Sequence, residues 1–204
     1  RAPAPRDDTG DANGRKSRKL SADLQAILTV LGRRSEEQRK RDEVEGRSLD
    51  LSHTDLRGAD LRNAHLERAD LSWSRLESSI LINTRFDNAR LMHVCLEGAV
   101  VIEASFQNAD LESANLKGLI LKDVCLKNAN LGAAKLQGAH FVNTDLEGAD
   151  LGAAELDDAI LRGAINLTQQ QIEEAAGNER TRLPAGLTLP PEWLPQDVTP
   201  QKQS

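Results

Sequence analysis

The sequence predicts an all-β solenoid, a quadrilateral parallel β-helix of about six coils, over residues 47–166. Three observations predict this fold. An apolar residue recurs at every fifth position from Leu51 to Leu161, 23 times without a break. At 19 of the 22 positions that lie two residues before a repeat centre, from 54 to 159, the side chain is Ala, Ser or Thr. Two residues after the centre, 12 of the 23 repeats carry Gly or Asn.

A period of five fits neither an α-helix nor a flat strand. Five steps along an α-helix rotate the chain by about 500°, so successive repeat centres would scatter around the helix axis. On a strand, an odd period makes the centres alternate between the two faces. Only a chain that turns a corner in every repeat directs all the centres inward. The expected inward core column includes Leu51, Leu61, Leu71, Phe86, Leu96, Phe106, Leu116, Leu126, Leu136, Phe141, Leu151 and Leu161.

The Gly and Asn residues after the centres predict the corners. Both residue types tolerate the positive φ that the third residue of a type II turn needs. The twelve are Gly58, Asn63, Asn83, Asn88, Gly98, Asn108, Gly118, Asn128, Gly138, Asn143, Gly148 and Gly163.

The outward positions predict how many repeats make one coil. Just before a centre, Ile or Val occurs only at Ile80, Val100, Ile120 and Ile160, and the intervals between them are all whole multiples of four repeats. A coil of four repeats stacks these four residues on one face, whereas a coil of three would scatter them. At about 4.8 Å per coil, the rod should be about 28 Å long. Phe86 and Phe106 should then stack inside adjacent coils.

Several stretches carry a family motif. Ala59-Asp60-Leu61, Ala109-Asp110-Leu111 and Ala129-Asn130-Leu131 resemble the A(D/N)LXX motif of the pentapeptide-repeat proteins. The resemblance implies a right-handed winding. Residues 24–34 and 181–187 also resemble the flanks of a bacterial subgroup that often has membrane helices upstream. This resemblance implies a chain that is anchored to a membrane through sequence preceding Arg1.

The flanks of the array predict two further segments. Residues 1–46 should comprise a disordered start, an amphipathic helix at about 21–31 and a charged stretch that forms a polar linker or a solvated helical turn. Residues 167–204 should comprise a capping helix and an extended tail. Thr168 and Gln171 have the spacing of a capping box, and Gly177 suits the end of that helix.

No group of residues predicts chemistry. His53, Trp73 and His93 share one corner on successive coils, and ring stacking explains them better than a metal site. Cys95 and Cys125 are one and a half coils apart, on opposite faces, so they should not form a disulfide. The repeated Asp residues suit local hydrogen bonding. We therefore predict no catalytic, cofactor-binding or metal-binding residues, no cofactor and no enzymatic activity.

One face should carry a stripe of outward aliphatic side chains. A patch of this kind rarely stays in contact with water on a monomeric protein. The expected cover is the N-terminal helix around Leu20–Leu31; the tail around Leu187–Trp193, a second copy and another protein are the alternatives. The stripe consists of Ile80, Ile82, Val100, Ile102, Ile120, Val142 and Ile160.

The prediction of function depends on two surface properties, the aliphatic stripe and the distribution of charge. The stripe favours a structural scaffold that binds a protein partner, as a monomer or a homodimer, in the cytoplasm or at the inner face of the membrane. The net charge of −6 argues against direct nucleic-acid binding. The alternative is a DNA mimic that regulates a type II topoisomerase, as the quinolone-resistance members of the family do. Residues 47–165 carry 18 acidic and 12 basic side chains, which is a mixed surface for a mimic.

Overall fold

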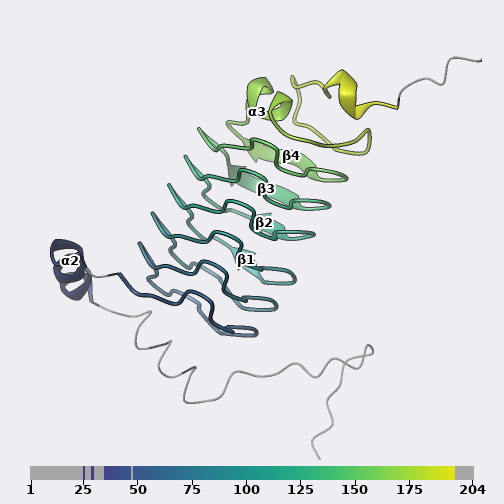
Figure 1. Ribbon diagram of the computed structural model, residues 1–204. Helices are drawn as coiled ribbons and strands as arrows, with labels where there is room; N and C mark the ends of the chain where they lie inside the picture. The colour runs from purple at the N-terminus through teal and green to yellow at the C-terminus, as the bar shows by residue number, and fades with distance from the viewer. Residues whose placement is uncertain (1–24, 26–28, 30–34, 47, 196–204) are drawn as a thin grey trace, which may run out of the picture.

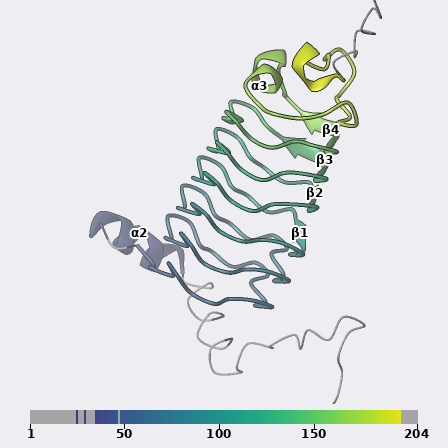
Figure 2. The same ribbon diagram turned by 45° about the vertical axis from the view of Figure 1, so that its right-hand side comes forward.

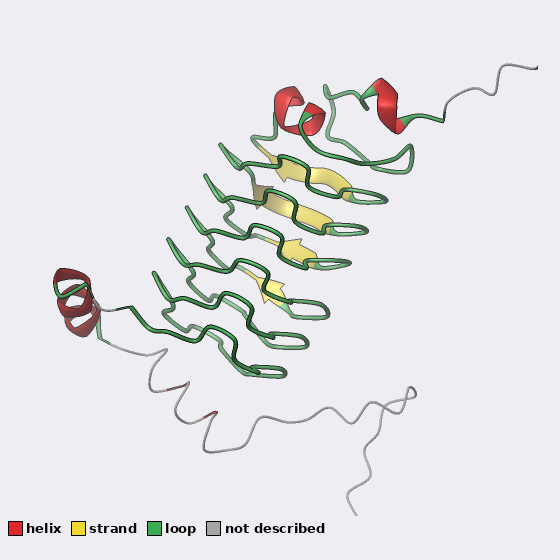
Figure 3. Cartoon of the chain, viewed as in Figure 1, coloured by secondary structure: helices red, strands yellow, loops and turns green. Residues whose placement is uncertain are grey.

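The structure is a computed structural model that describes residues 25, 29, 35–46 and 48–195. The repeats wind into a rod of stacked coils (Figure 1, Figure 2). Strands are confined to one side of the rod, and turns and loops form most of its remaining sides (Figure 3). The strands β1 to β4 pair in parallel in chain order. Their bounds are Val101–Ile102, Ile120–Lys122, His140–Asp145 and Ile160–Ile165.

Each coil consists of four five-residue repeats. Parallel bridges connect residues that lie four repeats apart, and one such column runs through Asp50, Asp70, Arg90, Asp110, Asn130 and Asp150. This spacing confirms the coil that was predicted from the outward Ile and Val residues. The solenoid fold and its parallel pairing are also as predicted.

The repeat centres fill the interior of the rod. All 23 of them are buried, as are 21 of the 22 residues that lie two positions before a centre; Thr54 at the first coil is half-buried. Phe86 and Phe106 stack with their ring centroids 4.9 Å apart and an interplanar angle of 10°. The predicted stack is confirmed, and the core is a narrow column of Leu, Ala and Phe.

The corners are turns that require positive φ. The amide of Ala59 donates to the carbonyl of Leu56 over 3.0 Å, and Gly58 between them has φ 71°. This combination defines a type II turn. Eleven of the twelve Gly and Asn residues predicted at corners have positive φ.

Gly163 is the exception, and the prediction of a corner there is wrong. It lies within β4 and pairs with Val142, where the register of β3 and β4 shifts. A Cβ at Gly163 would lie 2.5 Å from the carbonyl oxygen of Phe141. Gly163 is thus explained by the close approach of two strands, and the next residue with positive φ is Asn166, at 58°.

The C-terminal segment adds an irregular last coil. Glu155 bridges to Ala176 and Ile160 to Arg182, so both partners lie slightly further along the chain than a regular coil of four repeats would place them. Thr181 is buried, and its hydroxyl donates to the carbonyl of Leu156 over 2.9 Å. The segment after the repeats therefore continues the winding before it ends it.

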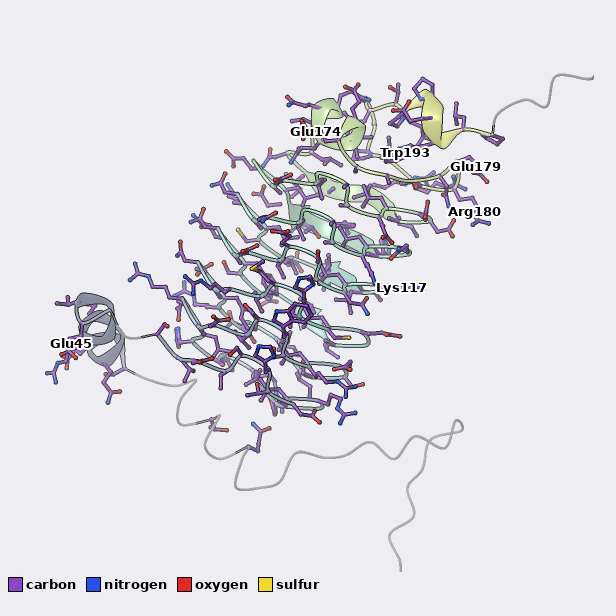
Figure 4. All side chains as sticks on the ribbon, in the orientation of Figure 1. Glu45, Lys117, Glu174, Glu179, Arg180 and Trp193 are labelled. Atoms are coloured by element: carbon purple, nitrogen blue, oxygen red, sulfur yellow. The ribbon has the colours of Figure 1, made fainter. Side chains whose placement is uncertain are left out.

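Helix α3 (Gln169–Glu173) lies on this last coil. Thr168 and Gln171 form the predicted capping box. The predicted helix end at Gly177 is wrong, because the C-cap is Glu174. Gly177 instead contacts Trp193 of the 3-10 helix Pro191–Trp193; a Cβ there would lie 2.6 Å from two ring carbons. Trp193 is only 5% exposed and closes this end of the rod (Figure 4).

A glutamine side chain pairs with the exposed backbone at each end of the rod. At the first coil, Asp60 donates its amide to Gln25 Oε1 over 2.9 Å and accepts from Gln25 Nε2 over 2.6 Å. At the last coil, Gln171 Nε2 donates to the carbonyls of Leu146 and Ala149 over 2.9 and 2.7 Å. The Gln25 amide takes the place of a peptide group at the open edge of the first coil, and the Gln171 amide does so at the Ala149 carbonyl, where α3 interrupts the winding; both satisfy backbone groups that would otherwise be left without a partner.

Gln171→Glu should therefore lower the free energy of unfolding by about 1–3 kcal/mol. The Glu carboxylate has the size of the Gln side-chain amide and can still accept from the Thr168 backbone N–H, which lies 2.8 Å from Oε1 of Gln171 in the structure. It cannot donate to the two carbonyls that Gln171 Nε2 reaches. Urea denaturation measures the loss, and Gln107→Glu, a change of the same charge at an exposed side chain on the rod, is the control. Equal stability of the two variants would contradict the cap.

The N-terminal flank is only partly described. Helix α2 (Glu36–Val44) falls in the predicted charged stretch and stands beside the first coils (Figure 1). The predicted disordered start at residues 1–19 lies outside the described residues, as does the amphipathic helix at about 21–31 apart from Gln25 and Thr29. In the described part of the chain, no helix has the length and apolar character needed to cross a bilayer.

Candidate functional site

The seven aliphatic residues lie together on the side of the rod that carries the strands. Bridges join Ile80 to Val100, and strand pairing aligns Ile120 with His140 and His140 with Ile160. Ile82, Ile102 and Val142 follow the inward residue on the same coils. β-Branched side chains favour extended backbone, which agrees with the position of β1 to β4 here. We call this surface the aliphatic face: Ile80, Ile82, Val100, Ile102, Ile120, Val142 and Ile160.

The aliphatic face is open to solvent among the described residues. Ile120 is 60% exposed, Val100 42% and Ile160 37%, and the other four residues are half-buried by one another and by the coil. The C-terminal tail, one of the predicted covers, packs instead over the end of the rod (Figure 1). The N-terminal helix, the favoured cover, lies outside the described residues apart from Gln25 and Thr29, and Gln25 binds the edge of the first coil.

The two long edges of the aliphatic face differ in height. One edge is the corner formed by Gly98, Gly118 and Gly138, all with positive φ. A Cβ at Gly118 or Gly138 would meet nothing within 4 Å, so this edge is flush with the face. The opposite edge carries side chains at the corners of the same coils, namely Glu103, Asp123 and Asn143, with Asn143 bonded to Asp123 over 2.7 Å.

Charges lie beside the aliphatic residues at both ends of the aliphatic face and on the coil of Ile120. At the first coil, Arg62 Nε donates to Asp60 Oδ1 over 2.9 Å. Further along, Lys122 Nζ lies 3.8 Å from the Asp123 carboxylate, and Arg162 follows on the coil of β4. Counting Asp60, Glu103 and Asp123 against Arg62, Lys122 and Arg162, the face carries no net charge.

The other three sides are mainly polar, and several of their charges are paired. Lys127 contacts Glu147 at 2.7 Å and Asp145 at 3.3 Å, and hydrogen bonds to both carboxylates raise the pKa of Lys127. The hydrogen bond from Arg57 lowers the pKa of Asp55 to about 2. Arg75 pairs with Glu77 at 2.8 Å in the same manner. Neighbouring cations thus neutralise much of the acidic surface.

The repeated acidic residues have a structural role. In each case the carboxylate accepts a hydrogen bond from the backbone amide two residues later, over 2.8 to 3.2 Å, and so stabilises the corner. This is the local hydrogen bonding that the sequence predicted. The residues are Asp60, Asp70, Asp110, Asp145 and Asp150.

The remaining candidates are a ring column and two thiols. Trp73 stacks on His93 at 3.9 Å between ring centroids and lies parallel to His53 at 6.3 Å. Cys95 and Cys125 are free thiols, and burial raises the pKa of Cys95. Among the described residues, no three His, Cys, Asp or Glu side chains come together as metal ligands would.

Sequence reasoning identifies the aliphatic residues but does not associate the glycine edge with them. A signal is present, because Gly98, Gly118 and Gly138 recur once in each successive coil. The requirement for positive φ already explains these glycines as turn residues. Their second property, a flush edge beside the aliphatic residues, becomes visible only when the coils are stacked.

Solved structures that are similar to this chain include those of three proteins. HetL of the cyanobacterium Nostoc, a pentapeptide repeat protein involved in heterocyst differentiation regulation, is 24% identical, over 74% of this chain and 80% of HetL, with a TM-score of 0.42. QnrB1, a plasmid-mediated fluoroquinolone resistance protein, is 19% identical, over 68% and 91%, with a TM-score of 0.43. A protein of the Arabidopsis thaliana thylakoid lumen is 27% identical, over 62% and 80%, with a TM-score of 0.33. The search of curated proteins found no match.

The family comparison agrees with the coil geometry. The profile for pentapeptide repeats matches residues 48–81, 69–101, 95–132 and 125–163, which together cover more than half of the chain and the whole regular part of the rod. The inward Leu column, the small residues before it and the corners after it are the features that the motif describes. This chain belongs to the pentapeptide repeat family.

Proposed function

We propose that this protein is a non-catalytic scaffold that binds a protein partner through its aliphatic face. The exposure of Val100 and Ile120, at the centre of the aliphatic face, carries the proposal. Burying such a surface stabilises a complex by about 25 cal/mol for each Å² of apolar area. The core of the rod does not need these side chains, because the inward column fills it. Their concentration on one side of four is therefore explained best by a partner.

The surface favours a protein partner over a nucleic-acid target. The chain has a net charge of −6, and direct binding to phosphates needs a basic surface. The DNA-mimic alternative needs rows of carboxylates that remain unneutralised. Here Arg57 pairs with Asp55 and Lys127 with Glu147, so the acidic surface is interrupted by cations. Neither direct nucleic-acid binding nor DNA mimicry would use an aliphatic face.

The proposed scaffold is located at a membrane. The resemblance of residues 24–34 and 181–187 to a membrane-linked subgroup supports a position at the cytoplasmic face of a membrane, with the anchor in sequence before Arg1. A rod with capped ends holds its aliphatic face in a constant orientation, which is what a scaffold at a surface requires.

A photoreactive side chain at position 120, in place of Ile120, should form cross-links to protein in living cells. The same group in place of Lys135 is the control, since Lys135 also precedes an inward residue but lies on a neighbouring, polar side of the rod. Gel mobility and mass spectrometry identify the products. Equal cross-linking from both positions, or none from position 120, would contradict a binding role for the aliphatic face.

A further inference from the structure

We propose that the occupant of the aliphatic face is a second copy of this chain, with the two rods side by side and parallel, related by a two-fold axis along the rod. This inference rests on the proposed function, because it assigns the partner of the same face. Three independent properties of the face are self-complementary under that one symmetry operation: its apolar columns, its edges and its charges.

The apolar columns match first. On each coil, one outward residue precedes the inward centre and one follows it. A two-fold axis along the rod exchanges these two columns at every level. Ile80 of one copy then meets Ile82 of the second copy, and Val100 meets Ile102. Apolar side chains therefore face one another on these two coils without a register shift along the rod, and on the next coils Ile120, Val142 and Ile160 meet Lys122, His140 and Arg162.

The shapes of the edges match as well. The same operation places the raised edge of each copy over the flush edge of the other. Glu103 comes to the level of Gly98, Asp123 to that of Gly118 and Asn143 to that of Gly138. The Gly118 and Gly138 corners leave open space where the side chains of Asp123 and Asn143 would lie, and at Gly98 the nearest atom to a Cβ would be Ser78 Oγ at 3.6 Å. With larger residues at those corners, the two faces could not approach closely.

The charges select the parallel arrangement. It sets Asp60 of each copy opposite Arg62 of the other, which gives two cross-pairs at the first coil. Lys122 and Arg162 face Ile120 and Ile160, along which their long stems can lie with the charged ends in water. An antiparallel arrangement with full overlap would instead set Arg62 against Arg162 and Glu103 against Asp123, which are like charges.

The size of the aliphatic face determines how strongly two copies are expected to associate. From Ile80 to Ile160 the stripe spans four coil steps, about 19 Å at the usual strand spacing. An interface of this length buries less than the roughly 1,200 Å² at which stable complexes begin, so the dimer should exchange with monomers. Self-association should accordingly appear in the micromolar range.

Sedimentation velocity of the full chain at about 1 to 500 µM tests the proposal, with a dissociation constant in that range expected. Ile120→Glu should weaken association at least about ten-fold by placing a charge in the buried centre. Gln107→Glu, with the same added charge on another exposed side, should leave it unchanged. Gly118→Asn should also weaken association by filling the flush edge. Its control is Ala133→Asn, at another corner with positive φ.

Arg62→Glu decides the orientation of the rods. In the parallel arrangement it places two carboxylates together and weakens the dimer, whereas in the antiparallel arrangement it removes the Arg62–Arg162 repulsion and tightens it. Tightening would overturn the two-fold axis along the rod. A chain that stays monomeric to the highest concentration, or a dimer unaffected by Ile120→Glu, would overturn the second copy as the occupant. Cross-links from position 120 to a different protein would then still support the proposed function.

Discussion

Phe106→Ala is expected to lower the free energy of unfolding by about 3–5 kcal/mol, through lost transfer energy and a cavity inside the rod. Phe106 is only 2% exposed and stacks on Phe86. The coil cannot collapse into the space, because its backbone is hydrogen-bonded to the coils on both sides: the Phe106 amide donates to Cys125 and the Ser105 amide to Thr84. Equilibrium denaturation in urea, followed by circular dichroism, measures the change.

Gln107→Ala is the matched control for Phe106→Ala. Gln107 is the next residue, its side chain is exposed, and its loss should change stability by no more than about 0.5 kcal/mol. A double variant with Phe86→Ala should reveal a coupling of about 0.5–1.5 kcal/mol from the ring stack. Similar costs at positions 106 and 107 would refute the inward and outward assignment of the repeat.

Trp193→Ala should destabilise the C-terminal end of the rod by about 3–5 kcal/mol. The indole ring is buried against Gly177, and its removal uncovers the last coil. In a solenoid each coil is stabilised mainly by its neighbours, so the loss begins at this end. Hydrogen exchange should accelerate first at the Arg182 amide, which donates to the carbonyl of Ala159 over 2.9 Å.

Two further variants complete the test of Trp193. Leu194→Ala changes the adjacent residue, which is 44% exposed, and should have little effect. Gly177→Ala should cost about 1–3 kcal/mol, because its Cβ would lie 2.6 Å from the ring and force the indole to move. Unchanged exchange at Arg182 in Trp193→Ala would mean that the tail does not secure the last coil.

The regular part of the rod could be predicted because one simple rule governs it. A period of five with a small residue two positions earlier leaves one arrangement for the chain, and Phe86 and Phe106 occupy the places that this rule assigns. The outward Ile80, Val100 and Ile120 also identified the coil length. The positions of the candidate face could therefore be predicted from the sequence, since side and level follow from residue number alone.

The corners were less predictable. At eleven corners the residue with positive φ is neither Gly nor Asn, and Trp73, Glu103 and Asp158 are examples. An isolated chain would disfavour this backbone by about 1–2 kcal/mol per residue. Here the hydrogen bonds of the neighbouring coils impose it, and single-residue preference does not contain that constraint.

The ends were the least predictable, because they depart from the rule. Nothing in the period indicates that Arg182 pairs with Ile160, or that Gly177 accommodates Trp193. The pairing of Gln25 with Asp60 joins residues 35 positions apart through a side chain, for which local sequence has no signature. The capping box at Thr168 could be predicted because its partners are three residues apart.

The irregular last coil also has a consequence while the protein is being synthesised on the ribosome. Synthesis proceeds toward the C-terminus, so Trp193 reaches the growing rod well after the last regular centre, Leu161. At about 5–20 residues per second, the backbone edge of the last regular coil stays exposed for several seconds before Trp193 can pack over it. Neighbouring chains on one messenger RNA present the same open edge at the same stage, and such edges pair readily. The cell therefore has most need to keep these chains apart on the ribosome, before the final coil is made.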